Sequence, residues 1–487
     1  MEAKTKLRVG SGQHERRISR HLYAHFIEHL GGCICDGIYV GDHPHIANID
    51  GLRCDTIEAL KKLQIPAVRW PGGLFADNYH WRDGIGPKSS RPIRQNLGWN
   101  SFENNQFGTH EFMQFCELIG AEPYLCLNLG SGTVEEAAAW AEYCNCALET
   151  TLTRERAANG HPTPFNVKYW SLGNEPGYPM DGMMRPGYYA DVARQFAGYV
   201  KFIAAQAPHA QDPRFRQAGV KMTLADYRCA REAVAEGRNA YFDLLAVHLY
   251  AGRTAPPEAS PLQQYRAMVA ELPEWRRQLA EASALAAGLS TDEHAIELAI
   301  DEWGVWKHEA TPLNGLQQSC TLGDALFAAA ALHLFCAEPC AFMANLAQTI
   351  NVLAAVILTD DEQFCRTPLY HVFDMLKVHQ DAWLVPCELD KNDGDACYAI
   401  ASQNDTGPLH LSVVNLSPDT SQNLHVELGQ SVMQLKESWV LTGESIAAQN
   451  SFDDEKIAPR AFDTPKNSAK GFDIAVPACS LVLLVFE

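Results

Sequence analysis

Eight short runs of almost continuously apolar residues alternate with helix-like segments between about residues 20 and 380. Strands buried on both faces of a parallel sheet show this continuous pattern, whereas strands with one exposed face alternate apolar and polar residues. Eight strand–helix units at this spacing predict an α/β fold, specifically a (β/α)8 TIM barrel. The predicted strands cover residues 22–28, 67–71, 123–129, 167–175, 220–225, 242–250, 296–303 and 342–348.

The segments between these runs have the apolar periodicity of amphipathic helices. Thr133 is followed by Glu136, which resembles a capping box, and Thr109 is the expected cap of another helix. The run 325–337 is the most apolar long stretch but is too short to cross a bilayer, which needs about 20 residues. We expect a buried helix there, and further helices over 56–63, 112–119, 133–143, 187–205 and 262–285.

The pattern changes after Trp383, where short strand-like segments are separated by turns such as 404–408. This pattern predicts an all-β sandwich with strands at 397–401, 409–416, 423–428, 432–441 and 481–486. We therefore assign 19–383 to a catalytic barrel and 384–487 to a β-sandwich domain, which a strand from 1–18 is expected to join.

The chain carries 59 acidic and 39 basic residues, a formal net charge of −20. An acidic protein lacks the basic face that nucleic acids and anionic membranes require. The first residues show no apolar stretch of a secretory signal, so a cytoplasmic location is expected. The 15 cysteines, an odd number, are then reduced core residues. The pairs Cys33/Cys35 and Cys144/Cys146 are too tightly spaced for zinc sites.

Polar residues stand at the ends of the predicted barrel strands, which is where barrel enzymes carry their active sites. Seven of the eight strand ends carry such residues, and all would converge on one mouth of the barrel. They are His25, Glu28, His29, Arg69, Asn128, Asn174, Glu175, His248, Tyr250, Asp301, Glu302 and Gln348.

Two carboxylates stand out among these residues. Glu175 ends the fourth strand, directly before Pro176, and Glu302 ends the seventh. Facing carboxylates are what glycoside hydrolysis needs, because one protonates the leaving oxygen while the other attacks the sugar or activates water. Alternatively, each could merely pair with Arg69 or cap a helix. Asp301 competes with Glu302, and strand alternation predicts that only one of the two points into the barrel.

Histidines and tryptophans near the strand ends leave alternatives open. His25, His29 and His248 could bind a metal, although no metal-binding spacing supports this, or they could bind substrate or a carboxylate. The aromatic rings could stack on a sugar or belong to the core: Trp70, Trp81, Trp99, Trp303 and Trp306. Gly72 and Gly73 lack the residues of a phosphate loop and are expected to let the backbone approach the site closely.

The segment Tyr169-Trp170-Ser171-Leu172-Gly173-Asn174-Glu175-Pro176 resembles the Asn-Glu acid/base motif of clan A glycoside hydrolases. More narrowly, the chain resembles the α-L-arabinofuranosidases of glycoside hydrolase family 51 over most of its length. Further similar segments fall in that family's order: 25–31, 69–73, 83–88, 91–92, 142–145, 248–250, 301–303 and 347–351.

The resemblance implies a barrel plus a β-sandwich and a retaining hydrolase without a cofactor or metal. It implies that Glu175 is the acid/base and Glu302 the nucleophile. Roles in substrate binding or in orienting and charging the catalytic carboxylates are implied for Glu28, Arg69, Asn174, His248, Tyr250 and Gln348, and Trp99 is also assigned to the substrate site. Family members are commonly oligomers, so a hexamer or trimer is expected.

One departure from the family pattern concerns sugar specificity. Many relatives carry Asn after Pro-Gly-Gly, where this chain has Leu74, so Asp77 or Asn78 could supply the missing contact. The leading hypothesis is exo-acting hydrolysis of terminal non-reducing α-L-arabinofuranosyl residues from arabinan, arabinoxylan or derived oligosaccharides. Leu74 keeps open a related retaining activity on galactofuranosides, xylosides or β-glucans. A non-catalytic sugar-binding barrel is the alternative from another class, and the presence of both glutamates argues against it.

Overall fold

The computed structural model describes residues 5–10, 16–206, 220–234, 241–390, 396–405, 407–429, 434–463 and 471–487. Eight strands form a closed barrel in which every neighbouring pair is parallel. Each of the eight predicted runs overlaps one of these strands, so the predicted (β/α)8 barrel is confirmed. Around the barrel they are β2 (Ala24–Phe26), β5 (Ala67–Trp70), β8 (Glu122–Cys126), β9 (Tyr169–Leu172), β10 (Lys221–Leu224), β11 (Leu244–Ala251), β12 (Glu297–Val305) and β13 (Ala341–Ala347).

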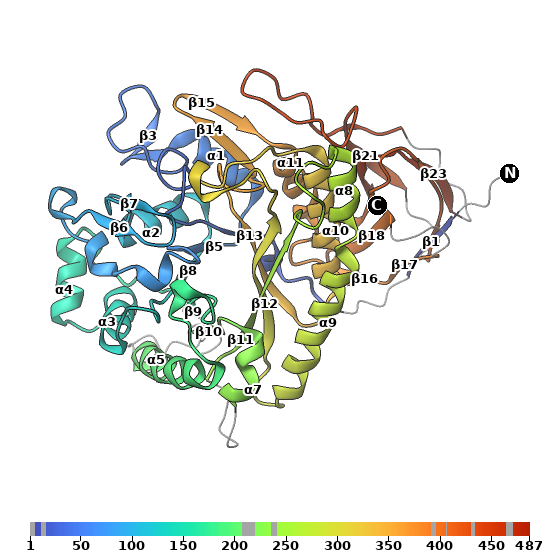
Figure 1. Cartoon of the computed structure of the whole chain (residues 1–487). Helices are drawn as coiled ribbons and strands as arrows, with labels where there is room; N and C mark the ends of the chain where they lie inside the picture. Colours follow the sequence, from blue (N-terminus) through green and yellow to red (C-terminus); the bar gives the residue numbers. More distant parts are fainter. Residues whose placement is uncertain are drawn as a thin grey trace.

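Helices surround this barrel on its outer side (Figure 1). Thr133 caps α3 by accepting a hydrogen bond from the backbone N–H of Glu136, as the sequence predicts. The described helices are α1 (Cys54–Leu63), α2 (Thr109–Ile119), α3 (Val134–Asn145), α4 (Thr151–Ala158), α5 (Pro186–Gln206), α7 (Ala230–Ala233), α8 (Pro261–Val269), α9 (Leu272–Leu289), α10 (Leu322–Ala337) and α11 (Pro368–Leu376).

Two helix predictions were wrong in detail. The N-cap of α2 is Gly108, one residue before the expected Thr109. Position 108 has no room for a side chain, since a Cβ there would lie 1.9 Å from the carbonyl oxygen of Gly84. The segment 262–285 forms two helices instead of one, and Pro273 lies in the first turn of the second. Proline has no backbone N–H to donate and is tolerated in the first turn of a helix but not in its interior.

Helix α10 is buried along nearly its whole length between the barrel and the all-β domain, as its uniformly apolar sequence predicts. No helix among the described residues combines the length and the apolar character needed to cross a membrane.

The all-β domain packs a six-stranded sheet against a four-stranded sheet. Strand β1 (Thr5–Val9) lies in the smaller sheet between β17 (Cys387–Leu389) and β20, although hundreds of residues separate it from both. The larger sheet begins with β16 (Trp383–Val385). The remaining strands are β18 (Cys397–Gln403), β19 (Leu409–Asn415), β20 (Gln422–Leu428), β21 (Leu435–Thr442), β22 (Arg460–Ala461), β23 (Phe472–Val476) and β24 (Ser480–Phe486).

Short hairpins extend from the barrel loops: β3 (Asn48–Ile49) with β4 (Leu52–Arg53), β6 (Arg94–Asn96) with β7 (Ser101–Glu103), and β14 (Ile357–Asp360) with β15 (Gln363–Arg366).

A buried polar cluster joins α10 to the all-β domain. His379 is 2.7 Å from the hydroxyl of Ser402 and 2.9 Å from that of Ser412, and Ser412 is 2.8 Å from His333 of α10. Burial lowers the pKa of His333 to about 3 and holds the pKa of His379 well below its usual value. Both imidazoles are therefore neutral in the folded protein at neutral pH.

These histidines make stability depend on pH. Their pKa values are lower in the folded than in the unfolded chain, so the unfolded chain binds more protons below about pH 6.5. The free energy of unfolding is expected to fall as pH falls from about 6.5 toward 4, by up to about 1.4 kcal/mol per pH unit for each histidine. Urea unfolding of His333→Gln across this range should give a shallower dependence than wild type. The exposed His45→Gln is the control, and an unchanged slope in His333→Gln would contradict the prediction.

Candidate active site

The side chains at the carboxyl ends of the barrel strands form one hydrogen-bonded network. Its centre is Arg69 of β5, which is fully buried. Arg69 donates from Nη1 to Oε1 of Glu302 (2.7 Å) and from Nη2 to Oδ1 of Asn174 (2.8 Å). The same guanidinium lies 4.7 Å from the centre of the Phe26 ring. Residues from β2, β5, β12 and the end of β9 therefore meet at one cation.

Asp301 and Glu302 both point into the barrel, so the expectation that only one would do so was wrong. Nε of Arg69 is 3.3 Å from a carboxylate oxygen of Asp301, which also accepts a hydrogen bond from Tyr124 across the barrel (3.1 Å). The pairing of β12 with β13 is irregular between Ile300 and Trp303. Such an irregularity breaks the strict alternation of side chains and can re-aim one of them.

Glu302 is buried and is held by three neighbours. Besides Arg69, the hydroxyl of Tyr250 donates to Oε2 (2.7 Å), and Nδ1 of His248 lies 3.5 Å from the same oxygen. Burial alone would raise the pKa of Glu302, but the positive charges of His248 and Arg69, with the hydrogen bonds from Arg69 and Tyr250, lower it below its usual value. The site therefore keeps this carboxylate ionised.

Glu175 lies beside Glu302 at the end of β9. Its Oε1 is 2.7 Å from Nδ1 of His248, and its side chain is 27% exposed. The backbone of Glu175 has φ +29°, a left-handed conformation that is strained for a residue with a side chain. One carboxylate oxygen of Glu175, one of Glu302 and one ring nitrogen of His248 all lie within 4.8 Å of one another. The two carboxylates therefore lie close together.

His248 connects the two glutamates electrostatically. Burial lowers its pKa, but the charge of Glu302 and the hydrogen bond and charge of Glu175 outweigh burial and raise the pKa to about 9. The imidazole is therefore a cation at neutral pH, lying between two carboxyl groups.

Glu28 forms the opposite side of the network. Its Oε1 accepts from the backbone N–H of Gly73 (3.1 Å) and Phe75 (2.9 Å), and its Oε2 accepts from Nε2 of Gln348 (3.0 Å). Burial, with a contribution from the charge of Glu302, raises the pKa of Glu28 to about 7, against the opposing hydrogen bonds from Phe75, Trp99 and Gln348. Glu28 can therefore accept hydrogen bonds from a ligand when ionised and donate one when protonated.

The two glycines before Leu74 allow the backbone to approach these carboxylates, as the sequence predicts. A Cβ on Gly73 would lie 2.5 Å from Oε1 of Glu302, and a Cβ on Gly72 would lie 2.5 Å from Cγ of Glu28. Neither position has room for a side chain.

Asp77 and Asp181 are buried site residues whose roles the sequence did not reveal. Asp77 accepts from the backbone N–H groups of Leu129 (2.6 Å), Gly130 (2.9 Å) and Asn174 (2.8 Å). It thus joins the loops that follow β8 and β9, and these bonds engage both of its oxygens. Asp181 accepts from Nδ2 of Asn174 (3.3 Å), so the Asn174 amide is held by Arg69 at one end and Asp181 at the other.

The hypothesis that Asp77 or Asn78 replaces the family asparagine receives no support from these contacts. Asp77 is occupied by backbone groups, and the amide of Asn78 reaches the carbonyl of Leu74 in its own turn (3.5 Å). Leu74 is half-buried against Gly98 in the β6–β7 hairpin.

The burial and contacts of the tryptophans and histidines decide between the roles that the sequence left open for them. Trp70, Trp81 and Trp303 are buried core residues, whereas Trp99 and Trp306 are partly exposed. Trp306 packs edge-on against Tyr250, with ring centroids 5.3 Å apart. His25 lies against Thr349 and His29 against Glu103, so the structure does not bring these two histidines together with His248 as metal ligands.

Within the described residues, the one group with metal-ligand spacing is Glu175, His248 and Glu302. Their ligand atoms already bind one another, Arg69 and Tyr250. The adjacent guanidinium also opposes a second cation. The donor set therefore fits a pair of acid–base groups better than a metal centre.

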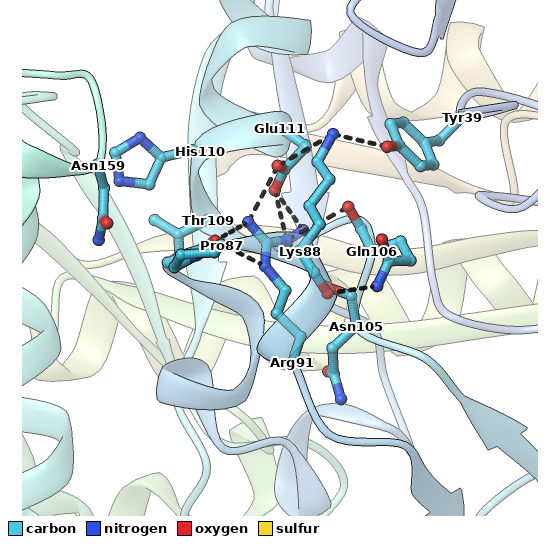
Figure 2. A network of polar contacts seen from close by, with 12 residues as sticks. Tyr39, Pro87, Lys88, Arg91, Asn105, Gln106, Thr109, His110, Glu111 and Asn159 are labelled. Atoms are coloured by element: carbon cyan, nitrogen blue, oxygen red, sulfur yellow. Dashed lines mark hydrogen bonds and ion pairs between the residues drawn. The ribbon is translucent and has the colours of Figure 1, made fainter. Parts of the chain in front are cut away.

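The hairpin that carries Trp99 is anchored on both sides. Figure 2 shows Arg91 making a two-point ion pair with Glu111 of α2 (3.0 and 3.1 Å) and binding the carbonyl of Asn105 (2.9 Å). On the barrel side, His29 is 2.7 Å from the Glu103 carboxylate of β7. These buried pairs anchor the hairpin that carries Trp99.

We expect Asp77→Ala to lower the thermal unfolding midpoint by several degrees. The substitution leaves two buried N–H groups and one part-buried N–H group without an acceptor, and each buried group left unpaired costs about 1–3 kcal/mol. Asp77→Asn keeps one acceptor oxygen and should lose less. Differential scanning calorimetry of both variants checks the order, and an unchanged midpoint for Asp77→Ala would show that these contacts are dispensable.

Comparisons with known proteins agree with the observed fold. Residues 59–260 match the family model described as "Alpha-L-arabinofuranosidase 1 domain", and residues 301–480 match "Alpha-L-arabinofuranosidase C-terminal domain". The chain is 35% identical to an "Intracellular exo-alpha-L-arabinofuranosidase" of Bacteroides ovatus, covering 98% of this chain and 95% of that protein.

Solved structures show the same likeness across the whole chain. The arabinofuranosidase of Xanthomonas axonopodis pv. citri, from glycoside hydrolase family 51, is 33% identical with a TM-score of 0.88, covering 99% of this chain and 100% of that one. An α-L-arabinofuranosidase from Thermotoga maritima, in an arabinose complex, is 29% identical with a TM-score of 0.86, covering 99% of each chain. On this evidence the chain belongs to the α-L-arabinofuranosidases of glycoside hydrolase family 51, which are hydrolases.

Proposed function

We propose that this protein is a retaining, exo-acting α-L-arabinofuranosidase that works by double displacement. The observation that carries the proposal is the facing pair Glu175 and Glu302, whose oxygens lie within 4.8 Å. Carboxyl groups about 5–5.5 Å apart are typical of retention, whereas inversion needs about 6.5–9.5 Å for an intervening water. The close approach of one oxygen from each carboxyl group supports retention.

In the first step, a carboxylate oxygen of Glu302 attacks the anomeric carbon of the arabinofuranosyl unit. The bond to the leaving oxygen breaks, and Glu175 gives that oxygen its proton. The products are a free alcohol or sugar and an arabinofuranosyl ester of Glu302. In the second step, Glu175 removes a proton from water, the resulting oxygen attacks the same carbon, and Glu302 leaves as a carboxylate. Two inversions retain the configuration.

The surrounding residues serve these steps. Arg69, His248 and Tyr250 keep Glu302 ionised before attack, and Asn174 is held so that its amide can bind the sugar hydroxyl next to the anomeric carbon. Glu28 and Gln348 would bind further furanose hydroxyls beside the Gly73 and Phe75 amides. Trp99 and Asn78 are proposed to border the same sugar subsite.

The expected substrates are arabinan- or arabinoxylan-derived oligosaccharides. The name of the Bacteroides ovatus relative supports exo action and an intracellular, cytoplasmic location for this chain, and resemblance to the family supports a hexamer or trimer. Cell fractionation and light scattering test these two points. Because Leu74 stands where many relatives carry Asn, galactofuranosides, xylosides and β-glucans should be tested beside arabinofuranosides.

The first test is hydrolysis of an arabinofuranosyl oligosaccharide and of 4-nitrophenyl α-L-arabinofuranoside by wild type, Glu175→Ala and Glu302→Ala. On the oligosaccharide each variant is expected to lose at least about a thousandfold in kcat, because a nucleophile or a proton donor is missing. Azide should rescue Glu175→Ala with retained product and Glu302→Ala with inverted product. Rescue with the opposite configurations would exchange the two roles.

The activity of His248→Gln should show a shifted pH profile. The charge of His248 helps to lower the pKa of Glu302, so its removal raises that pKa. The acidic limb of kcat/KM for an arabinofuranoside is expected to move to higher pH. His45→Gln, an exposed change, is the control. An unmoved acidic limb would show that His248 does not set the ionisation of Glu302.

A further inference from the structure

Asp181 is a buried carboxyl group in the loop that follows Glu175. It ends the 3-10 turn η5 (Pro179–Asp181), and the residue is 1% exposed. Its Oδ2 accepts the hydrogen bond from Nδ2 of Asn174, whereas its Oδ1 has no hydrogen-bond partner among the described residues. Within that part of the chain Asp181 also has no cation as a partner. None of the steps of double displacement uses this residue.

We propose that Asp181 is a positioning residue: as an uncharged carboxylic acid, it holds the Asn174 amide so that one N–H remains for the sugar. The inference rests on the proposed function and deepens it. Asn174 lies beside the nucleophile, since a Cβ on Gly73 would be 2.5 Å from Oε1 of Glu302 and 3.4 Å from Oδ1 of Asn174. A turn of the Asn174 amide therefore changes the site close to the anomeric carbon.

Arg69 and Asp181 together fix both ends of the Asn174 amide. The guanidinium of Arg69 carries only donors, so the amide oxygen must face it (2.8 Å) and the NH2 group must face Asp181 (3.3 Å). One N–H of that group donates to Asp181. The second N–H has no acceptor among the described residues, so it remains for the sugar hydroxyl next to the anomeric carbon.

The surroundings of Asp181 keep it protonated at neutral pH. Burial raises its pKa to about 10, and the negative charges of Asp77, Glu175 and Glu302 act in the same direction, against the hydrogen bond from Asn174. Because Oδ2 accepts from the amide, the proton is assigned to Oδ1.

The two cations of the site are engaged by other carboxylates. Arg69 is paired with the two acidic residues of β12, and His248 lies between the two facing glutamates. A buried carboxylate without a cation is very costly, so Asp181 takes up a proton instead. In this form it accepts the hydrogen bond of the amide without adding a further negative charge beside the nucleophile.

Two variants separate the hydrogen bond from the charge. Asp181→Asn keeps an acceptor oxygen and should retain at least about a third of the wild-type kcat on 4-nitrophenyl α-L-arabinofuranoside, with an unmoved acidic limb of kcat/KM. Asp181→Leu has the same branched shape but no acceptor. Its kcat should fall about tenfold while its KM changes less than about twofold, because contacts to that hydroxyl strengthen in the transition state.

Stability and a double-mutant cycle distinguish positioning from a merely structural role. An apolar side chain in place of an unpaired buried carboxyl should not lower the thermal unfolding midpoint, so Asp181→Leu should lose activity without losing stability. Since Asp181 acts through Asn174, Asp181→Leu should cost no further kcat in an Asn174→Ala background. Asp181→Ala repeats these comparisons if the leucine variant is not recovered as folded protein.

An unchanged kcat in Asp181→Leu, or the same tenfold loss in the Asn174→Ala background, would overturn the positioning role. So would an acidic limb that moves to lower pH in Asp181→Asn, because removal of a negative charge lowers the pKa of Glu302. A midpoint that falls together with kcat in both Asp181→Leu and Asp181→Ala would assign Asp181 a structural role instead. If wild type does not cleave the arabinofuranoside at all, the proposed function fails rather than this inference.

Discussion

The active site depends on the placement of one buried cation, Arg69. Burial alone would lower the pKa of its guanidinium, but the charges of Asp301 and Glu302 raise it well above its usual value. A buried guanidinium must be paired, since an isolated charge in the interior is very costly. Arg69 meets this need through two carboxylates from β12 and the amide oxygen of Asn174. The same contacts fix the nucleophile candidate and its neighbouring loop.

Further buried side chains around the Arg69 network hold the loops that carry its residues. Asp77 binds the backbone of the loops after β8 and β9, while the Arg91–Glu111 and His29–Glu103 pairs hold the hairpin that carries Trp99. None of these side chains belongs to the facing glutamate pair. They act by satisfying buried backbone or charged groups, so that the loops have few alternative conformations.

The barrel was predictable because its signal repeats. Each strand lies in a short apolar run, and the residues at the ends of the runs include nearly all members of the network around Arg69. Local irregularities were not predictable. The inward direction of both Asp301 and Glu302 depends on a pairing irregularity, and the backbone contacts of Asp77 depend on loops distant in sequence. Strand β23 went unpredicted because its short alternating pattern, Phe472–Val476, is a weak signal.

Strand β1 lies between β17 and β20 in the all-β domain, so its partners come from the far end of the sequence. During synthesis on the ribosome this strand is made early, and the barrel strands follow before either partner exists. Its N–H and C=O groups therefore remain available for pairing with other strands throughout that interval. The outward-facing side chains of β1 include Lys6 and Arg8, and charged side chains on an open strand oppose its association with neighbouring nascent chains.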